Sequence, residues 1–263
     1  MVVRTKEEFI LIRRCGKDLA SALNAVVAMV RPGITLRELD EKAREEIEKR
    51  GARPSFLGYG TPPFPGALCT SPNEVVVHGI PDERVLSEGD CVGLDIGLER
   101  DGFYVDMATT VAVGEVKKQI KSLMKVTEES LHHGISAAMP GKKVGVIGYA
   151  IQTYIKKSGN YGIVRDFAGH GVGRAVHEEP TVPNYGSPHF GPLIREGEIL
   201  AIEPMITLGT ERVRLGRNQW DVVTADGSPS AHYEHTVLYH SKLHGPYIIT
   251  TSEDFPEDDG SWW

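Results

Sequence analysis

A helix signal occurs twice in this chain, 108 residues apart, and this repeat is the feature that most constrains the fold. A Pro-Gly pair at 32–33 recurs at 140–141, and strand-like segments rich in Val, Ile and Tyr follow each copy. Apolar residues four positions apart form one face of a helix. The repeat predicts two related halves of helices and antiparallel strands, packed into one α+β domain. Chance is the alternative, because Pro-Gly before a helix is common. The matched apolar residues are Leu39, Ala43 and Ile47 in the first copy and Ile147, Ile151 and Ile155 in the second.

The two helices of the first half have clear N-terminal signals. The sequence matches the S/T-x-x-E capping pattern at 5–8 and again at 35–38. No Ser/Gly-rich linker separates the two halves. We therefore predict a single catalytic domain over residues 1–252, followed by an acidic surface tail over residues 253–263.

Composition excludes several classes of function. The net charge is −7 and no cluster of Lys and Arg occurs, so nucleic acid is not expected as the main partner. The first residues lack the apolar core of a signal peptide, and no run of 18 apolar residues exists, so no membrane partner is expected. The 3 cysteines have no repeating spacing, which argues against a disulfide framework and favours a cytoplasmic location.

Two predicted strands, at 91–99 and 103–113, carry one central aspartate each, and the Asp-Gly pair between them is typical of a hairpin turn. A two-residue loop leaves two registers open, depending on which two residues form it, whereas a three-residue loop would put the two aspartates on opposite faces of the sheet. Asp95 either faces Asp106 directly or lies diagonal to it, and both registers put the two carboxylates on one face of the sheet. Facing acids in apolar strands repel one another, and a divalent cation would compensate for that repulsion. The alternative is that both aspartates face solvent.

Three further segments carry a histidine or a carboxylate that ordinary packing does not explain. His170 lies between glycines, which let the backbone approach closely and leave the imidazole accessible. Glu203 ends an apolar strand before a proline, where an unpaired buried carboxylate is costly. Glu234 lies in a strand-like run at 233–239, and an exposed position on an edge strand is its alternative explanation.

In this order, these segments resemble those of the methionine aminopeptidases. The resemblance extends from the first helix to about residue 250 and implies the pita-bread fold, with two pseudo-symmetric halves of helices packed on an antiparallel sheet. The chain has no N-terminal extension, which is similar to the short bacterial type I form. The resemblance rests on Asp95 and Asp106, Gly-His-Gly-Val-Gly at 169–173 with His177, Ile-Glu-Pro-Met at 202–205, Tyr-Glu-His-Thr at 233–236, and the segment 73–81.

The resemblance implies two divalent metal ions per chain, which would be Co²⁺, Mn²⁺, Fe²⁺ or Zn²⁺. Asp95 would bind one ion through both oxygens, and His170 and Glu203 would complete the other. Asp106 and Glu234 would bridge the two ions. All five positions are intact in this sequence.

The resemblance also implies roles for individual residues in catalysis and in substrate binding. Glu203 would take the proton of the attacking water and pass it to the leaving amine, while His177 and His78 would hydrogen-bond the scissile amide and the oxyanion. Phe56, Val176 and the loop 58–65 depart from the usual family pattern, so the shape of the methionine pocket is open. The expected pocket residues are Tyr59, Phe64, Cys69, His78, His177 and Trp220. Asn73, Val75 and Ser230 correspond to a site for one Na⁺ or K⁺ in some relatives.

The implied function is removal of the N-terminal methionine from nascent proteins and peptides whose second residue is small. The expected partner is the N-terminal Met of a polypeptide, and association with the ribosome is open. No apolar stripe suggests an obligate dimer, so a monomer is expected. Two alternatives are kept: an X-Pro dipeptidase on the same fold, which usually carries an extra N-terminal domain, and a catalytically inactive binding protein, which tends to lose ligands.

Overall fold

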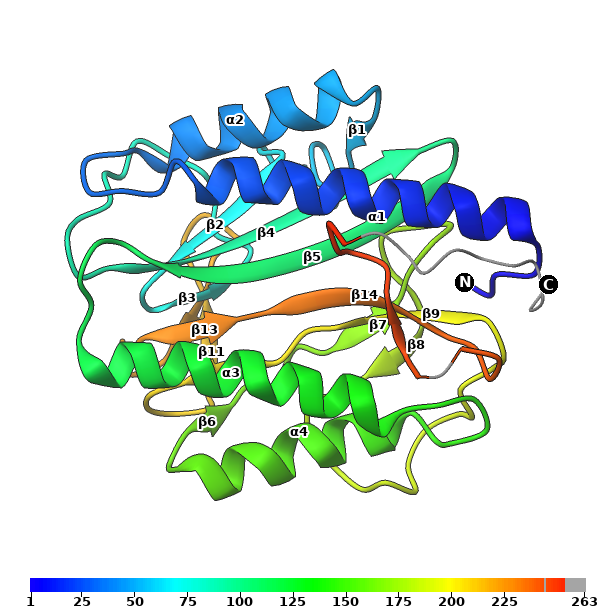
Figure 1. The fold of residues 1–263 in the computed structure, drawn as a ribbon. Helices are drawn as coiled ribbons and strands as arrows, with labels where there is room; N and C mark the ends of the chain where they lie inside the picture. The colour runs from blue at the N-terminus through cyan, green and yellow to red at the C-terminus, as the bar shows by residue number, and fades with distance from the viewer. Residues whose placement is uncertain (244, 254–263) are drawn as a thin grey trace.

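Two pairs of helices flank a curved antiparallel sheet, α1 and α2 on one side and α3 and α4 on the other (Figure 1). The computed structural model describes residues 1–243 and 245–253. The predicted surface tail at 253–263 falls, except for its first residue, outside this range. Among the helices of the described residues, none combines the length and the apolar composition that crossing a bilayer requires. The helices are α1 (Lys6–Val27), α2 (Leu36–Lys49), α3 (Lys118–Ala137) and α4 (Gly145–Ser158).

The main sheet has nine strands, and its path runs β1-β4-β5-β14-β9-β7-β8, with β2 beside β4 and β15 beside β14. Two three-stranded sheets, β13-β10-β6 and β11-β12-β3, complete the structure. The main strands are β1 (Arg53–Pro54), β2 (Leu68–Pro72), β4 (Cys91–Arg100), β5 (Phe103–Ala112), β7 (Gly169–Gly171), β8 (Glu178–Val182), β9 (Glu198–Ile202), β14 (Glu234–Tyr239) and β15 (Tyr247–Ile248). The small sheets contain β3 (Val75–Val77), β6 (Gly162–Ile163), β10 (Met205–Thr207), β11 (Val213–Leu215), β12 (Val222–Thr224) and β13 (Ser230–His232).

The helices begin where the capping signals predicted. The Thr5 hydroxyl accepts a hydrogen bond from the backbone N–H of Glu8, and Thr35 and Glu38 form a complete capping box at the start of α2. These bonds satisfy backbone N–H groups that the first turn of a helix leaves without partners.

The repeated apolar residues pack two separate cores, one for each half. Ile47 of α2 and Ile151 of α4 are both 0 % exposed, the first in a core with α1 and the second in a core with α3. Fully burying an aliphatic side chain of this size stabilises the folded state by roughly 1.5–3 kcal/mol. The predicted α+β architecture of two related halves is therefore confirmed.

The hairpin between β4 and β5 resolves the register that the sequence left open. Arg100 pairs with Phe103, so Asp101 and Gly102 form the loop, with φ angles of 53° and 76°. Two consecutive positive φ angles are typical of the type I′ turn that joins twisted strands. In this register Asp95 pairs with Ala108, and so lies diagonal to the aspartate at 106.

Candidate metal centre

Strand register brings the predicted ligands to one face of the sheet. Ala108 of β5 pairs with Asp95 on one side and with Glu234 of β14 on the other. Asp106 lies two residues from Ala108 and therefore shares its face. Three acids from three adjacent strands thus converge, although up to 139 positions of sequence separate them.

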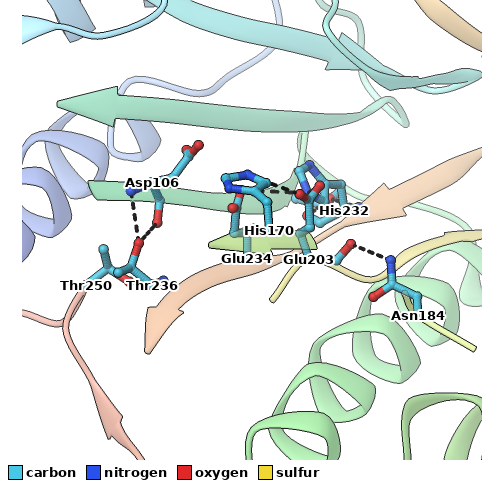
Figure 2. Close-up of polar contacts among 9 residues, drawn as sticks. Asp106, His170, Asn184, Glu203, His232, Glu234, Thr236 and Thr250 are labelled. Atoms are coloured by element: carbon cyan, nitrogen blue, oxygen red, sulfur yellow. Dashed lines mark hydrogen bonds and ion pairs between the residues drawn. The ribbon is translucent and has the colours of Figure 1, made fainter. Parts of the chain in front are cut away.

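The other two predicted ligands come from the next strands of the sheet. His170 of β7 pairs with Ala201 of β9. Glu203 follows directly after β9 and its backbone carbonyl accepts a hydrogen bond from the Asn184 amide at 3.0 Å. The Nε2 atom of His170 lies 3.5 Å from Oε1 of Glu203 (Figure 2).

The glycines around His170 are required by close backbone approach. A Cβ atom built at Gly171 would lie 2.3 Å from the carbonyl oxygen of Glu179, and one at Gly169 would lie 2.3 Å from that of Ala201. Both obstacles are backbone, so only glycine fits in the pairing of β7 with its two neighbours.

Among the described residues, four of the five predicted ligands and one further histidine form two overlapping groups, within each of which the potential ligand atoms lie within 4.8 Å of one another, and Asp95 is in neither group. One group contains Asp106, His170 and Glu234. The other contains Glu203, His232 and Glu234. His232 was missed at the level of sequence, although it lies two residues before Glu234, a spacing that puts two strand residues on the same face.

The site fits cations because it is buried, acidic and poorly hydrogen-bonded. Among the described residues, Oδ1 of Asp95, Oδ1 of Asp106 and Oε1 of Glu234 are buried without a hydrogen-bond partner. Buried polar atoms normally have a partner, and carboxylate and imidazole groups are common ligands of divalent ions. The cluster can therefore bind metal.

Burial dominates the electrostatics of the cluster. It raises the pKa of Asp95 to about 6, and it raises the pKa of Glu203 well above the ordinary value. Burial, with the charges of neighbouring acids, has the same effect on the pKa values of Asp106 and Glu234. Burial lowers the pKa of His170 to about 4, so that its imidazole is neutral and able to act as a ligand.

A cavity of about 110 Å³ opens directly onto this cluster. Its far wall is apolar and aromatic, and Phe64 and Trp220 pack edge to face there with ring centroids 5.2 Å apart. Every residue that the sequence predicted for the pocket lies in its lining. The lining consists of Phe56, Tyr59, Phe64, Cys69, His78, Asp95, Asp106, His170, His177, Glu203, Trp220 and Glu234.

The two predicted catalytic histidines lie beside the cluster in different settings. His78 has a φ of 59° and packs edge to face against Phe167 and Trp220, and burial lowers its pKa to about 4. The ring of His177 lies 4.4 Å from that of His170, centroid to centroid. Its Nδ1 atom is 2.7 Å from the hydroxyl of Tyr59.

Three oxygen atoms converge at the predicted monovalent site. The Ser230 hydroxyl lies 3.1 Å from the carbonyl oxygen of Asn73 and 3.0 Å from that of Val75. One hydroxyl proton can serve only one of the two carbonyls fully. The site for Na⁺ or K⁺ stays a prediction.

Comparison with known proteins identifies the protein family to which the chain belongs. The sequence model of metallopeptidase family M24 matches residues 10–241. The fold, the buried acidic cluster and this match together define an M24 metallopeptidase, that is, a metal-dependent hydrolase.

Within that family, the chain is similar to bacterial methionine aminopeptidases over nearly its whole length. It is 44% identical over 254 residues to the methionine aminopeptidase of Clostridium acetobutylicum, covering 96% of this chain and 100% of the relative. It is 42% identical over 237 residues to methionine aminopeptidase 1 of Bacillus subtilis, covering 90% and 94%. The chain therefore belongs to the methionine aminopeptidases, as its motifs predicted.

Solved structures confirm the predicted pita-bread fold. The methionine aminopeptidase of Thermotoga maritima superposes with a TM-score of 0.91 at 39% identity, covering 95% of this chain and 100% of that one. The prolidase of Pyrococcus furiosus reaches a TM-score of 0.76 at 22% identity, covering 96% and 66%. The second likeness is one of fold alone, so the comparisons do not favour the X-Pro dipeptidase alternative.

Proposed function

We propose that this chain removes the N-terminal methionine from polypeptides whose second residue is small. The proposal rests on one observation: the same cavity is lined by a buried acidic cluster at one end and by an aromatic, sulfur-containing wall at the other. A methionine thioether makes favourable contacts with aromatic rings, which suits the wall formed by Phe64, Trp220 and Cys69.

Five side chains of the proposed site would hold two divalent ions, which we propose to be Co²⁺, Mn²⁺, Fe²⁺ or Zn²⁺. The four carboxylates carry about four negative charges when ionised, which two divalent ions would neutralise. A pair of such ions supplies Lewis acidity and lowers the pKa of water, so that a nucleophile exists at neutral pH. The five ligands would be Asp95, Asp106, His170, Glu203 and Glu234.

The protein's own side chains would carry out the remaining steps, which are proton transfer and hydrogen bonding to the substrate. Glu203 would accept the proton of the attacking water and return it to the leaving amine. His177 and His78, which line the same cavity, would donate hydrogen bonds to the scissile amide and to the oxygen on which negative charge develops. The apolar wall would bind the methionine side chain and exclude water from it.

The finer expectations are part of the same proposal. Asn73, Val75 and Ser230 would hold one Na⁺ or K⁺. We also propose a cytoplasmic enzyme, because polypeptide synthesis exposes new N-termini in the cytoplasm and because Cys15, Cys69 and Cys91 are all unpaired. We propose that it acts as a monomer, because the sequence contains no apolar stripe that suggests an obligate dimer.

The test is hydrolysis of a Met-Ala-Ser peptide by protein that has been exhaustively dialysed against a chelator. We expect no release of methionine until Co²⁺, Mn²⁺ or Fe²⁺ is added back, and unaffected activity after chelation would overturn the proposal. A Leu-Pro peptide serves as the second substrate. Faster hydrolysis of the Leu-Pro peptide would favour the X-Pro dipeptidase, and no hydrolysis of either would favour the inactive binding protein.

A further inference from the structure

His232 is a buried histidine of the metal centre to which none of the roles above is assigned. It is 3 % exposed, and within the described part of the chain its Nε2 atom has no hydrogen-bond partner. That atom lies 3.5 Å from Oε2 of Glu203 and 3.9 Å from Oε2 of Glu234 (Figure 2). An orphaned buried nitrogen between two carboxylates needs an explanation.

The backbone of His232 is held in place by hydrogen bonds and strand pairing. Its N–H donates to the hydroxyl of Thr110 at 2.9 Å, and the same hydroxyl donates to the His232 carbonyl at 2.8 Å. His232 also pairs with Met205 at the end of β13. Because its backbone is anchored on both sides, His232 occupies a defined position beside the acidic cluster.

The distances do not describe a hydrogen bond. A charge-assisted N–H···O bond to a carboxylate is about 2.7–2.9 Å long, and even ordinary N–H···O bonds reach only about 3.2 Å. The two separations from His232 exceed both limits. Direct positioning of either carboxylate by a hydrogen bond is therefore not what this geometry provides.

The 3.5 Å separation of His232 Nε2 from Glu203 Oε2 is close to the spacing of two ligands of one ion, whereas the 3.9 Å separation from Glu234 Oε2 is longer than that spacing. With metal–ligand bonds of about 2.1 Å and angles of about 90–110°, adjacent ligand atoms are about 3.0–3.4 Å apart. The structure supplies its own reference, because Nε2 of His170 lies 3.5 Å from Oε1 of Glu203. The two oxygens of Glu203 thus each face one imidazole nitrogen at the same distance.

We propose that His232 is a sixth protein ligand of the metal centre, and that it binds through Nε2 beside Glu203 and Glu234. This inference rests on the proposed function, since it requires that the centre binds ions. A second neutral nitrogen donor would make the centre less purely oxygen-based. It would therefore favour ions that accept imidazole, such as Co²⁺, Zn²⁺ and Fe²⁺, over Mg²⁺.

The experiment is cobalt loading of the chelated full-length protein and of His232→Gln. Proton NMR of the Co²⁺ protein resolves the exchangeable N–H of each coordinated imidazole as a paramagnetically shifted signal. We expect two such signals in the unsubstituted protein and one in His232→Gln. By calorimetry, we expect the weaker of the two Co²⁺ affinities to fall 10- to 100-fold in the variant.

His235→Gln is the matched control. His235 is a partly buried histidine on the neighbouring strand β14, and its Nδ1 atom contacts the Thr250 hydroxyl at 3.0 Å instead of the acidic cluster. We expect its Co²⁺ signals and affinities to equal those of the unsubstituted protein. His232→Cys is a second variant, and a sulfur-to-cobalt charge-transfer band in its near-ultraviolet spectrum would independently support direct ligation.

The inference would be overturned if His232→Gln kept both shifted signals and both affinities. A loss of kcat without change in the cobalt signals would overturn it as well, because it would indicate a role other than ligation. Failure of the proposed function gives a different result: an inactive binding protein would bind no pair of ions in its unsubstituted form, and an X-Pro dipeptidase would hydrolyse the Leu-Pro peptide faster than Met-Ala-Ser, whatever the His232 variants show.

Discussion

At the scale of single residues, the contact between Tyr59 and His177 bears on which nitrogen of the imidazole carries hydrogen. The Tyr59 hydroxyl lies 2.7 Å from Nδ1 of His177. If the hydroxyl donates, the imidazole accepts at Nδ1 and keeps its hydrogen on Nε2. Nε2 is then the donor available to the substrate.

Replacement of Tyr59 by Phe tests this arrangement. We expect kcat on a Met-Ala-Ser peptide to fall about 10-fold, the equivalent of one hydrogen bond of about 1–1.5 kcal/mol. KM should change little, because the ring stays in the pocket wall. Tyr161→Phe is the control, since the Tyr161 hydroxyl bonds Ser122 away from the cavity. An unchanged kcat in Tyr59→Phe would contradict the assigned tautomer.

The ionisable residues of the cluster also predict how metal removal changes stability with pH. Burial raises the pKa of Asp95 to about 6, above its value in the unfolded chain. Between about pH 4 and pH 6, this carboxyl therefore keeps a proton in the folded, metal-free protein that it has released in the unfolded chain. This contribution to stability is complete below about pH 4 and is lost as the pH rises through 6.

Bound cations should prevent this loss of stability at higher pH, because their positive charge compensates the negative charge of the ionised carboxylates. We expect the difference in Tm between Mn²⁺-loaded and chelated protein to widen from pH 5 to pH 8. Thermal unfolding at fixed ionic strength measures it. A difference that stays constant or narrows over this range would show that the buried acids are not the origin of the effect.

The residues of the acidic cluster that we propose as metal ligands stand out in the sequence because each one conflicts with its local surroundings. Asp95, Glu203 and Glu234 are charged residues in apolar strands, and His170 is flanked by glycines instead of packing partners. His232 produced no such conflict, because a histidine at the end of a short strand is ordinary. Its place in the cluster depends on three-dimensional contacts with segments over 100 residues away.

At the scale of secondary-structure elements, β7 shows how packing limits the residues beside a ligand. Ala at Gly171 would place its Cβ 2.3 Å from a backbone carbonyl of β8. We expect Gly171→Ala to destabilise the protein by about 2 kcal/mol or more, because neither strand can yield without breaking the pairing. Metal content should fall with it, since the change displaces His170.

Gly93→Ala provides the comparison for that variant. Gly93 lies on β4, two residues from Asp95, but its nearest neighbours would be 3.4 Å or more from an added Cβ. We expect this variant to keep its metal content and to lose less than about 1 kcal/mol in urea unfolding. Equal losses in the two variants would mean that close backbone approach is not the reason for glycine in β7.

Elements differ in how far the sequence predicts them. The capped helices α1 and α2 begin where predicted, because capping is a local interaction. The hairpin register needed the structure, since two loops were compatible with one Asp-Gly signal. The strands of the small sheets have only two or three residues and are too short to establish any periodicity, so their pairing could not be predicted.

At the scale of the whole molecule, the active site is the junction between the two halves. Asp95 and Asp106 belong to the first half, whereas His170, Glu203 and Glu234 belong to the second. The repeat in the sequence predicted two halves, but it did not predict that β5 would pair with β14. Such pairing between distant strands depends on the packed structure and leaves no local signal.

Thr236 replaces regular strand pairing at this junction. Its hydroxyl accepts a hydrogen bond from the Asp106 N–H at 2.9 Å and donates to the Asp106 carbonyl at 2.7 Å. The side chain is 0 % exposed. One hydroxyl therefore satisfies both backbone groups of a proposed bridging ligand and joins the halves at that point.

We expect Thr236→Val, which has nearly the same shape, to destabilise the protein by about 2–3 kcal/mol in urea unfolding, because both Asp106 backbone groups lose their partner in a buried position. Thr236→Ser keeps the hydroxyl and should lose only about 1 kcal/mol. Metal affinity should fall in the Val variant and not in the Ser variant, since only the former frees the backbone that orients the Asp106 carboxylate. If Val and Ser variants were equally stable and bound metal equally well, the two halves would be held in register by the strand pairing of β5 with β14 alone.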